Sequence, residues 1–190
     1  MRSRQTNKPD KYIVSECAKV LRDELPYNLH IFVNSVEFIA KVIDTLKLAP
    51  EAVKVVCSTS GESRQENQRK LGNAYPIGQP SDPAKKINFY TSTCFEGCDI
   101  FDPDGVTFIV SDGRKAHTLL DISTLFTQIC GRIRDSRYKA QIVHVYSTTK
   151  YSKAVTLDEF VAATQRTLAD AESYAAEINS LSEATRVKTL

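Results

Sequence analysis

Three arginines lie close together in one short segment of the chain. Arg132, Arg134 and Arg137 follow Gln128 and Gly131. An arginine presents a planar fork of donors that matches phosphate oxygens two at a time. Placed against a γ-phosphate bound to a neighbouring domain, such a side chain stabilises the charge of phosphoryl transfer. Cations also gather at helix C-termini, where they stay solvated. A solvated arginine needs neither the glutamine nor the glycine, so the segment indicates a phosphate contact.

A second polar segment, residues 91–99, directly follows a predicted buried strand. The hydroxyls of Thr91 and Thr93 would lie at the carboxyl end of that strand, where open α/β sheets bind their ligands. Gly97 lets the backbone approach a ligand closely, and Asp99 is placed to accept a hydrogen bond from a ribose hydroxyl. Alone, the pattern T-x5-G-x-D is a weak signal, because turns use the same residue types.

A third candidate is the boundary between a strand and a helix at Asn34 and Ser35. The free backbone N–H groups of a helix N-terminus, with these two polar side chains beside them, can hold a phosphate of a nucleic-acid strand. The alternative is that Asn34 only caps the helix, with Glu37 completing a capping box. On this segment alone, the capping interpretation is favoured.

The elements that must position these segments alternate between strand and helix. Apolar, β-branched runs predict strands at residues 30–33, 53–57, 87–90, 106–110 and 141–146. Apolar residues at helical spacing predict helices at 10–24, 36–46, 64–71 and 122–134. This alternation predicts an α/β fold with a parallel sheet and helices on both faces. Residues 1–9 are polar and are predicted to lack regular structure.

The last part of the chain follows a different pattern. Thr156 and Glu159 form a predicted capping box, and the helix after it is expected to run to about Ala184. Its apolar side repeats at heptad-like spacing, at Leu157, Val161, Thr164, Leu168, Ala171, Ala175 and Ile178. Packing of this seam on its own domain is favoured, with docking on a missing domain or self-association as alternatives. The predicted organisation is a helical extension (1–27), an α/β domain (28–150) and a helical appendage (151–190).

Composition narrows the class of protein. A 42% hydrophobic and 25% charged chain of 190 residues is typical of a soluble globular protein, and its net charge of +2 creates no overall field that attracts nucleic acid. No leader-like or membrane-spanning run occurs, so a cytoplasmic location is expected. Five cysteines without a C-x-x-C pair argue against disulfides and a structural metal site. One alternative is an unrelated α/β enzyme with Cys94 or Cys98 as nucleophile, but no histidine is placed to activate either thiol.

Taken together, the three polar segments resemble motifs IV, V and VI of superfamily 2 helicases, in order, across roughly residues 28–147. The T-x5-G-x-D string followed by Q-x-x-G-R carries most of the resemblance. It implies a RecA-like domain that packs against a first RecA-like domain. ATP with Mg²⁺ would bind in the cleft between the two, and the nucleic-acid strand would lie across both.

The resemblance also implies roles for individual residues. Gln128 and Arg132 would face the nucleotide, with Arg132 as the arginine finger, and Gly97, Asp99 and Gly131 would lie on the nucleotide side. Contacts to the nucleic-acid backbone would come from Asn34, Ser35, Ser58, Thr91 and Thr93. The common second arginine is replaced by Asp135, and Arg134 lies one position early. This form is similar to herpesvirus-type origin-binding helicases, so Arg134 or Arg137 would take the second role, and DNA is favoured over RNA.

Two features of such a motor are missing from the sequence. No G-x-x-x-x-G-K-[ST] string and no acidic pair after an apolar strand is present, so nothing cradles the β- and γ-phosphates or holds Mg²⁺. The chain alone is therefore predicted not to hydrolyse ATP, and the first RecA-like domain is its expected partner. The alternative function is a stand-alone, non-catalytic module that binds nucleic acid or regulates a motor.

Overall fold

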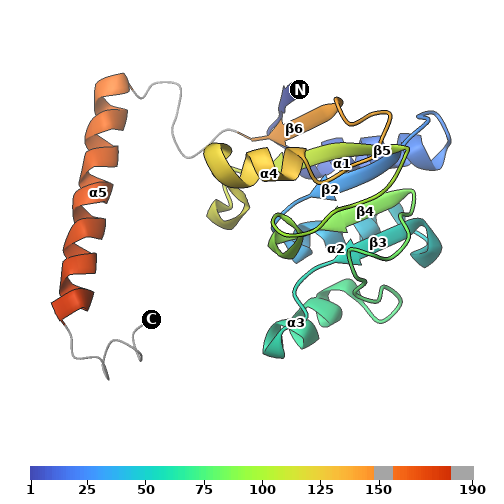
Figure 1. Cartoon of the computed structure of the whole chain (residues 1–190), viewed down its shortest axis with the longest axis horizontal. Helices are drawn as coiled ribbons and strands as arrows, with labels where there is room; N and C mark the ends of the chain where they lie inside the picture. Colours follow the sequence, from blue (N-terminus) through green and yellow to red (C-terminus); the bar gives the residue numbers. More distant parts are fainter. Residues whose placement is uncertain (148–155, 181–190) are drawn as a thin grey trace. The chain divides into compact units, whose positions relative to one another are not determined.

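A single six-stranded parallel sheet forms the core of the first part of the chain (Figure 1). The computed structural model describes residues 1–147 and 156–180, and the chain divides into two compact units, Met1–Lys150 and Tyr151–Leu190. The strand order is β1-β6-β5-β2-β4-β3, and every pair is parallel. The strands are β1 (Arg2–Gln5), β2 (Asn28–Phe32), β3 (Val53–Val56), β4 (Ile87–Tyr90), β5 (Gly105–Ser111) and β6 (Ile142–Tyr146). The predicted α/β class with a parallel sheet is confirmed.

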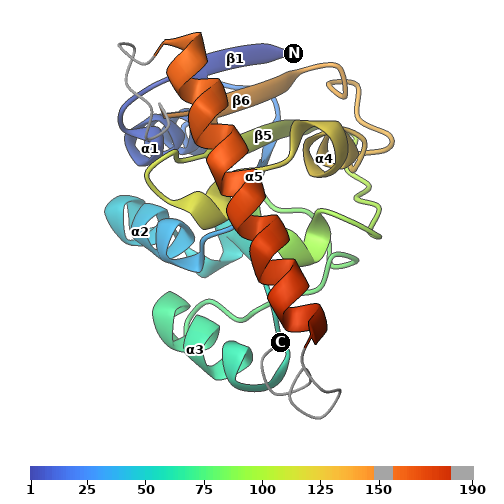
Figure 2. The same ribbon diagram turned by 90° about the vertical axis from the view of Figure 1, so that its left-hand side faces the viewer.

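Helices flank the sheet on both faces, as the sequence predicts. Helices α1 (Pro9–Leu21) and α2 (Val36–Leu46) lie on one side of the strands, and α4 (Thr127–Cys130) lies on the other (Figure 2). Helix α3 (Gly61–Leu71) packs beside α2. Helix α2 is strongly amphipathic, and its buried residues Phe38, Ile39, Val42 and Ile43 face the sheet core.

Alternate residues along the strands give the two faces of the sheet different chemistry. The face that packs with α1 and α2 is wholly apolar, with Leu29, Ile31, Val53, Val55, Ile87, Phe89, Val106 and Phe108. The opposite face mixes aromatic and aliphatic side chains with buried polar ones, namely His30, Phe32, Lys54, Asn88, Tyr90, Thr107 and Ile109. Buried polar groups are costly unless they are hydrogen-bonded. This polar face therefore needs specific partners. The connection from β4 to β5 supplies one for His30, and the chain before β4 supplies those of Lys54.

The N-terminal residues and α1 differ from the predictions. Arg2–Gln5 forms the edge strand β1, paired with β6, where no regular structure was expected. All four of its side chains are exposed, so it carries no hydrophobic pattern, and the backbone of β6 stabilises it instead. Helix α1 falls within the predicted range 10–24 apart from Pro9 at its start; it buries Ile13, Cys17 and Val20, whereas Leu21 is 38% exposed.

The predicted helix over residues 122–134 is wrong in its second half. A π-helical turn (Ile122–Phe126) leads into the four-residue α4, which ends at Gly131. The backbone then leaves the helix, because Ile133 forms an isolated parallel bridge with Ile100. The apolar spacing of Leu125, Ile129 and Ile133 fitted a helix, yet Ile133 is buried from an extended segment. Arg132 and Arg134 therefore lie on either side of the bridged Ile133, beyond the end of α4.

The second unit contains helix α5 (Leu157–Ser180). Its predicted capping box is confirmed: the backbone N–H of Thr156 donates to Glu159 Oε2 at 2.8 Å, and the N–H of Glu159 donates to Thr156 Oγ1 at 3.3 Å. Leu157, Val161 and Leu168 of the predicted seam are exposed. Ala184, where the helix was predicted to end, lies outside the described residues. No helix within residues 1–147 and 156–180 is long and apolar enough to cross a membrane.

Candidate functional site

The carboxyl ends of β3, β4 and β2 lie side by side and form one continuous edge of the sheet. The backbone N–H of Thr91 donates to Val56 O at 3.0 Å, and the N–H of Val33 donates to Tyr90 O at 2.9 Å. The predicted nucleic-acid contacts all follow these strands directly, and they are Asn34, Ser35, Ser58, Thr91 and Thr93. The structure thus brings these five residues to the same edge.

The sequence offered Asn34 as the cap of the second predicted helix, but the structure gives that role to Ser35. The N-cap of α2 is Ser35, whose buried hydroxyl accepts from the N–H of Phe38 at 3.2 Å. The predicted Asn34–Glu37 capping box is therefore wrong, and Glu37 pairs instead with Lys115 at 3.0 Å. Asn34 is occupied elsewhere, because its Nδ2 donates to His117 O at 2.9 Å and its Oδ1 accepts from the N–H of Ser92 at 3.4 Å. Its side chain thus ties the end of β2 to the chain after β4 and to the chain after β5.

The two threonines after β4 differ in exposure. Thr91 is only 5% exposed, whereas Thr93 is open to solvent, and their hydroxyl oxygens lie 3.3 Å apart. Ser58 is half-buried, and its hydroxyl lies 3.0 Å from that of Ser60. Thr93 is therefore the more accessible of the two threonine hydroxyls, and Thr91 is placed to orient it.

The segments 91–99 and 128–137 meet although no sequence pattern joins them. The N–H of Ile100 donates to Arg132 O at 2.9 Å, and the N–H of Arg134 donates to Ile100 O at 3.1 Å. Across this bridge, Arg134 Nε lies 2.7 Å from Asp99 Oδ1. We call residues 98–100 together with 132–134 the arginine junction.

Arg132 differs from the other two arginines of its segment. Its Nη1 donates to Cys98 O at 2.9 Å, and its Nε is buried without a hydrogen-bond partner, the one such side-chain atom in the described part of the chain. Arg134 is paired with Asp99, and Arg137 with Asp104. Arg132 is thus the member of this set that carries an uncompensated charge and an unused buried donor, a combination that suits an anionic ligand.

The remaining predicted nucleotide-side residues lie around the arginine junction. Gln128 is half-buried on α4, and the C-cap residue of that helix, Gly131, is exposed. Gly97 is exposed with φ at +70°, and a Cβ there would meet nothing within 4 Å. The backbone conformation at this position requires a glycine, because a residue with a Cβ is strained in the left-handed region.

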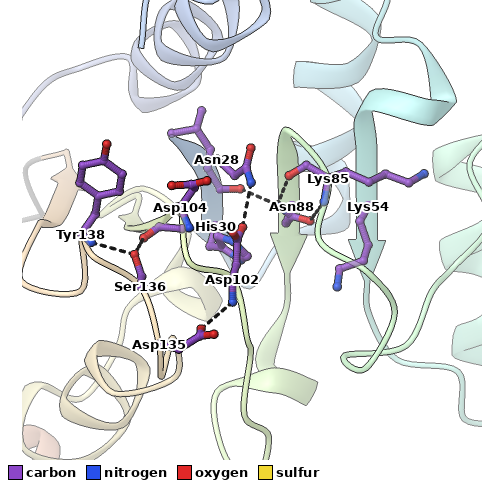
Figure 3. A network of polar contacts seen from close by, with 12 residues as sticks. Asn28, His30, Lys54, Lys85, Asn88, Asp102, Asp104, Asp135, Ser136 and Tyr138 are labelled. Carbon is purple, nitrogen blue, oxygen red and sulfur yellow. Dashed lines mark hydrogen bonds and ion pairs between the residues drawn. The ribbon is translucent and has the colours of Figure 1, made fainter. Parts of the chain in front are cut away.

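A buried polar network that the sequence did not predict holds the β4–β5 connection onto the polar face of the sheet (Figure 3). His30 Nε2 lies 2.8 Å from Asp102 Oδ2, and His30 Nδ1 lies 3.0 Å from the hydroxyl of Tyr90. Asn28 Nδ2 donates to the same carboxylate oxygen at 3.0 Å. In turn, the N–H of Asp102 donates to Asp135 Oδ1 at 2.9 Å. Asp135, which departs from the common helicase pattern, therefore fixes the start of β5 to the chain that follows the arginine junction.

The hydrogen bonds define the protonation state of this network. An ionised carboxylate only accepts, so His30 donates from Nε2 to Asp102 and accepts the Tyr90 proton at Nδ1. Burial lowers the pKa of His30 more than its carboxylate partner raises it, which keeps the ring neutral. Burial raises the pKa of Asp102, but the bonds from His30 and Asn28 outweigh that effect and leave it below its usual value. His30 appeared from sequence to be an ordinary strand residue, since its partner lies 72 positions away.

A second buried cation lies near this network. Lys54 is 5% exposed, its Nζ donates to Asp82 O at 2.7 Å, and it lies 5.7 Å from the centre of the Tyr90 ring. Burial lowers the pKa of its ammonium group. Its partners are backbone carbonyls and an aromatic ring, so it contributes to the packing of β3 and not to an open site.

The cysteines do not form a catalytic centre. All five are free, and Cys94 is fully buried, where burial raises the pKa of its thiol to about 12. Such a thiol stays protonated near neutral pH and is a poor nucleophile. Cys98 Sγ donates to Cys94 O at 3.2 Å. Within residues 1–147 and 156–180, no three potential metal-ligating side chains are gathered together.

Comparison with known proteins adds no assignment: no protein-family model matches the chain, and no curated protein matches its sequence. The site must therefore be interpreted from its own chemistry. It combines an edge of hydroxyl and amide groups with a junction that holds one unpaired arginine. Both features suit phosphate groups, the first as a row of neutral donors and the second as a fixed cation.

Proposed function

We propose that residues 1–147 are the second RecA-like domain of a superfamily 2 helicase or translocase, which is half of an ATP-driven nucleic-acid motor. A first RecA-like domain, on the same full-length chain or on a partner subunit, would supply the phosphate-binding loop and the Mg²⁺ ligands. The observation that carries the proposal is the bridge between Ile100 and Ile133. It joins the two segments on which the resemblance to these helicases mainly depends, although they are far apart in sequence.

Arg132 is the proposed arginine finger. Its backbone is fixed by the bridge to Ile100, and its Nη1 is anchored on Cys98 O. The buried, unpaired Nε fits an anion, since a buried donor without a partner costs free energy that a phosphate oxygen would recover. ATP with Mg²⁺ would supply that anion from the neighbouring domain. Gln128 would approach the nucleotide from α4, and Gly131 presents no side chain that obstructs it.

The carboxyl edge of the sheet is the proposed nucleic-acid contact. Thr93 and Ser58 would donate from their hydroxyls to backbone phosphates, with Thr91 orienting Thr93. Asn34 would donate the Nδ2 proton that is not bonded to His117 O, while the hydroxyl of Ser35 already caps α2. These groups contact the backbone and not the bases, so the edge would bind with little sequence preference. The Gly-Arg-x-Arg form favours DNA as the nucleic acid.

Steady-state ATP hydrolysis, with and without single-stranded DNA, tests this proposal. The 190-residue chain and the full-length gene product are assayed in parallel. We expect no turnover from the chain alone and DNA-stimulated turnover from the full-length product. Arg132→Ala should abolish that turnover, and Arg22→Ala is the matched control, because Arg22 is exposed and pairs only with Glu24.

Two outcomes would contradict the proposal in different ways. Turnover by the isolated chain would mean that it holds a phosphate-binding site of its own, so the division between two domains would be wrong. Absence of turnover from the full-length product, with DNA binding retained, would replace the motor with a non-catalytic binding module.

A further inference from the structure

A cationic pocket lies outside the residues assigned above. It has a volume of about 310 Å³ and lies between the start of α1, the first part of α2 and the chain that follows β5. Five cationic side chains line it, and they are Lys8, Lys11, Lys41, Arg114 and Lys115. We call this the α1 pocket.

The charges in the α1 pocket do not balance. Its three carboxylates each already have a cation: Asp10 lies 2.5 Å from Lys41, Glu37 lies 3.0 Å from Lys115, and Asp112 lies 2.9 Å from Arg114. No carboxylate in the described part of the chain forms an ion pair with Lys8 or Lys11. Two ammonium groups in the pocket are therefore uncompensated.

The paired cations also retain binding capacity. Lys115 and Glu37 are 36% and 76% exposed, so their ion pair contributes little free energy and a phosphate can replace the carboxylate of Glu37. Asp10 is only 18% exposed and holds Lys41 more firmly. Arg114 gives Nε and one Nη2 proton to Asp112 and keeps its remaining donors free. Asp112 is itself held by the hydroxyl of Ser147 at 2.8 Å, which fixes the position of the arginine.

The α1 pocket continues the carboxyl edge of the sheet. All six strands are parallel, so β5 and β1 end at the same edge as β2, β3 and β4. Arg114 follows β5, and Lys8 follows β1. Asn34 connects the two regions, since its Nδ2 donates to His117 O in the same turn that carries Lys115. With strands about 4.8 Å apart, the edge from Ser58 to Lys8 extends over about 24 Å.

We infer that the α1 pocket binds a backbone phosphate of the single nucleic-acid strand that crosses this edge, with Lys8 and Lys11 as its principal cations. This inference rests on the proposed function, and it extends the path of the strand from β3, β4 and β2 across β5 to the end of β1. The ligand is a phosphodiester, because the pocket offers charge without base-reading groups and adjoins a row of neutral phosphate donors.

Salt-dependent binding of labelled single-stranded DNA to the 190-residue chain tests the inference. The variants are Lys8→Gln with Lys11→Gln, compared with Lys47→Gln and Lys139→Gln, which remove the same charge from the opposite edge of the sheet. All four lysines are exposed, so folding should be unchanged, as checked by circular dichroism. Because Lys8 and Lys11 together would neutralise one phosphate, the first pair should reduce the slope of log K against log salt by about 0.7. The control pair should leave the slope unchanged.

Asn34→Ala and Thr93→Ala, measured in the same way, separate this inference from the proposed function. If they weaken binding while Lys8→Gln with Lys11→Gln has no effect, the α1 pocket is not a strand contact and the proposed edge remains. If only the lysine pair weakens binding, the α1 pocket stands and the helicase-type edge is contradicted. Binding of inorganic phosphate to the wild type but not to the lysine variant, at constant ionic strength and with equal DNA binding by the two, would make the pocket a free-phosphate site and overturn the inference. Failure of the wild type to bind DNA would also overturn it.

Discussion

Asp99 accepts a hydrogen bond from Arg134 Nε at 2.7 Å, between segments 35 positions apart in sequence. The two side chains are about half exposed, so their attraction contributes little to folding. Its effect is on geometry, because it holds the Arg134 guanidinium against the segment that Ile100 bridges to Ile133. A nucleotide that engaged Asp99 through its ribose would release Arg134, so the pair can couple ligand binding to the position of an arginine.

This coupling predicts different results for stability and activity. In a double-mutant cycle with Asp99→Asn and Arg134→Gln, the interaction free energy in urea unfolding of the 190-residue chain should stay within about 0.5 kcal/mol. The same cycle on ATP turnover of the full-length product should show a coupling of at least about tenfold, or about 1.4 kcal/mol. Equal coupling in the two measurements would mean that the pair is only a surface ion pair.

Arg132→Ala should affect catalysis strongly and stability weakly. An arginine finger accounts for about a 10³-fold or larger effect on turnover, so kcat of the full-length product should fall by at least that factor. In the isolated chain, the substitution removes both the Nη1 bond to Cys98 O and the buried Nε without a partner. These losses have opposite effects, so the free energy of unfolding should change by less than about 1 kcal/mol. Thermal unfolding and ATP turnover check the two statements. A loss of several kcal/mol in stability would instead make Arg132 a structural residue.

Three strands could be predicted because each is buried on both faces. All residues of β3, β4 and β5 are buried, and such strands carry mainly apolar or β-branched residues. The edge strand β1 is exposed and has no such run, so only its pairing with β6 reveals it. Local sequence signals therefore define the buried strands, including β3 at the other edge of the sheet, and miss the exposed one.

The candidate site was predicted as separate segments, but their contacts were not. The order of motif-like strings located Arg132 and Asp99, yet the helix expected through Ile133 concealed the bridge to Ile100. Similarly, His30 and Asp102 show no local pattern, because their hydrogen bond depends on how the β4–β5 connection returns over the sheet. Long-range contacts of this kind follow from the assembled fold and not from residue spacing.

Three glycine-to-alanine substitutions should rank in a definite order of stability. At Gly105, a Cβ would lie 2.9 Å from the His30 ring, which is held on both sides, so Gly105→Ala should cost about 1–3 kcal/mol through overpacking. At Gly97, nothing lies within 4 Å, and the cost should be the roughly 1 kcal/mol of a left-handed backbone. At Gly131, the nearest atom would be 3.6 Å away, and the change should stay within about 0.5 kcal/mol. Urea unfolding measures all three. A smaller cost at Gly105 than at Gly97 would contradict the fixed position of the His30 ring.

The buried His30 should make stability depend on pH. Burial lowers the pKa of His30 in the folded chain, while in the unfolded chain it titrates near its ordinary value of 6.5. As pH falls through that value, only the unfolded state gains this proton, so the free energy of unfolding should fall, by up to about 1.4 kcal/mol per pH unit for one histidine. Burial also lowers the pKa of His144, so this residue adds a similar contribution to the pH dependence. Asp102 contributes only at lower pH, since its pKa lies below 3.8.

Two glutamine variants separate these contributions. In urea unfolding between about pH 5 and 8, His30→Gln should flatten the pH dependence and also lower stability by about 1–3 kcal/mol at neutral pH, because Tyr90 and Asp102 lose a buried partner. His144→Gln should flatten the pH dependence with a smaller loss at neutral pH, since His144 is half-buried and bonds only the Ser111 hydroxyl, at 3.1 Å. A stability that rises more steeply with pH in His30→Gln than in the wild type would mean that His30 is protonated in the folded chain near neutral pH. The network would then be an ion pair with Asp102, stabilising the fold at low pH and weakening as pH rises.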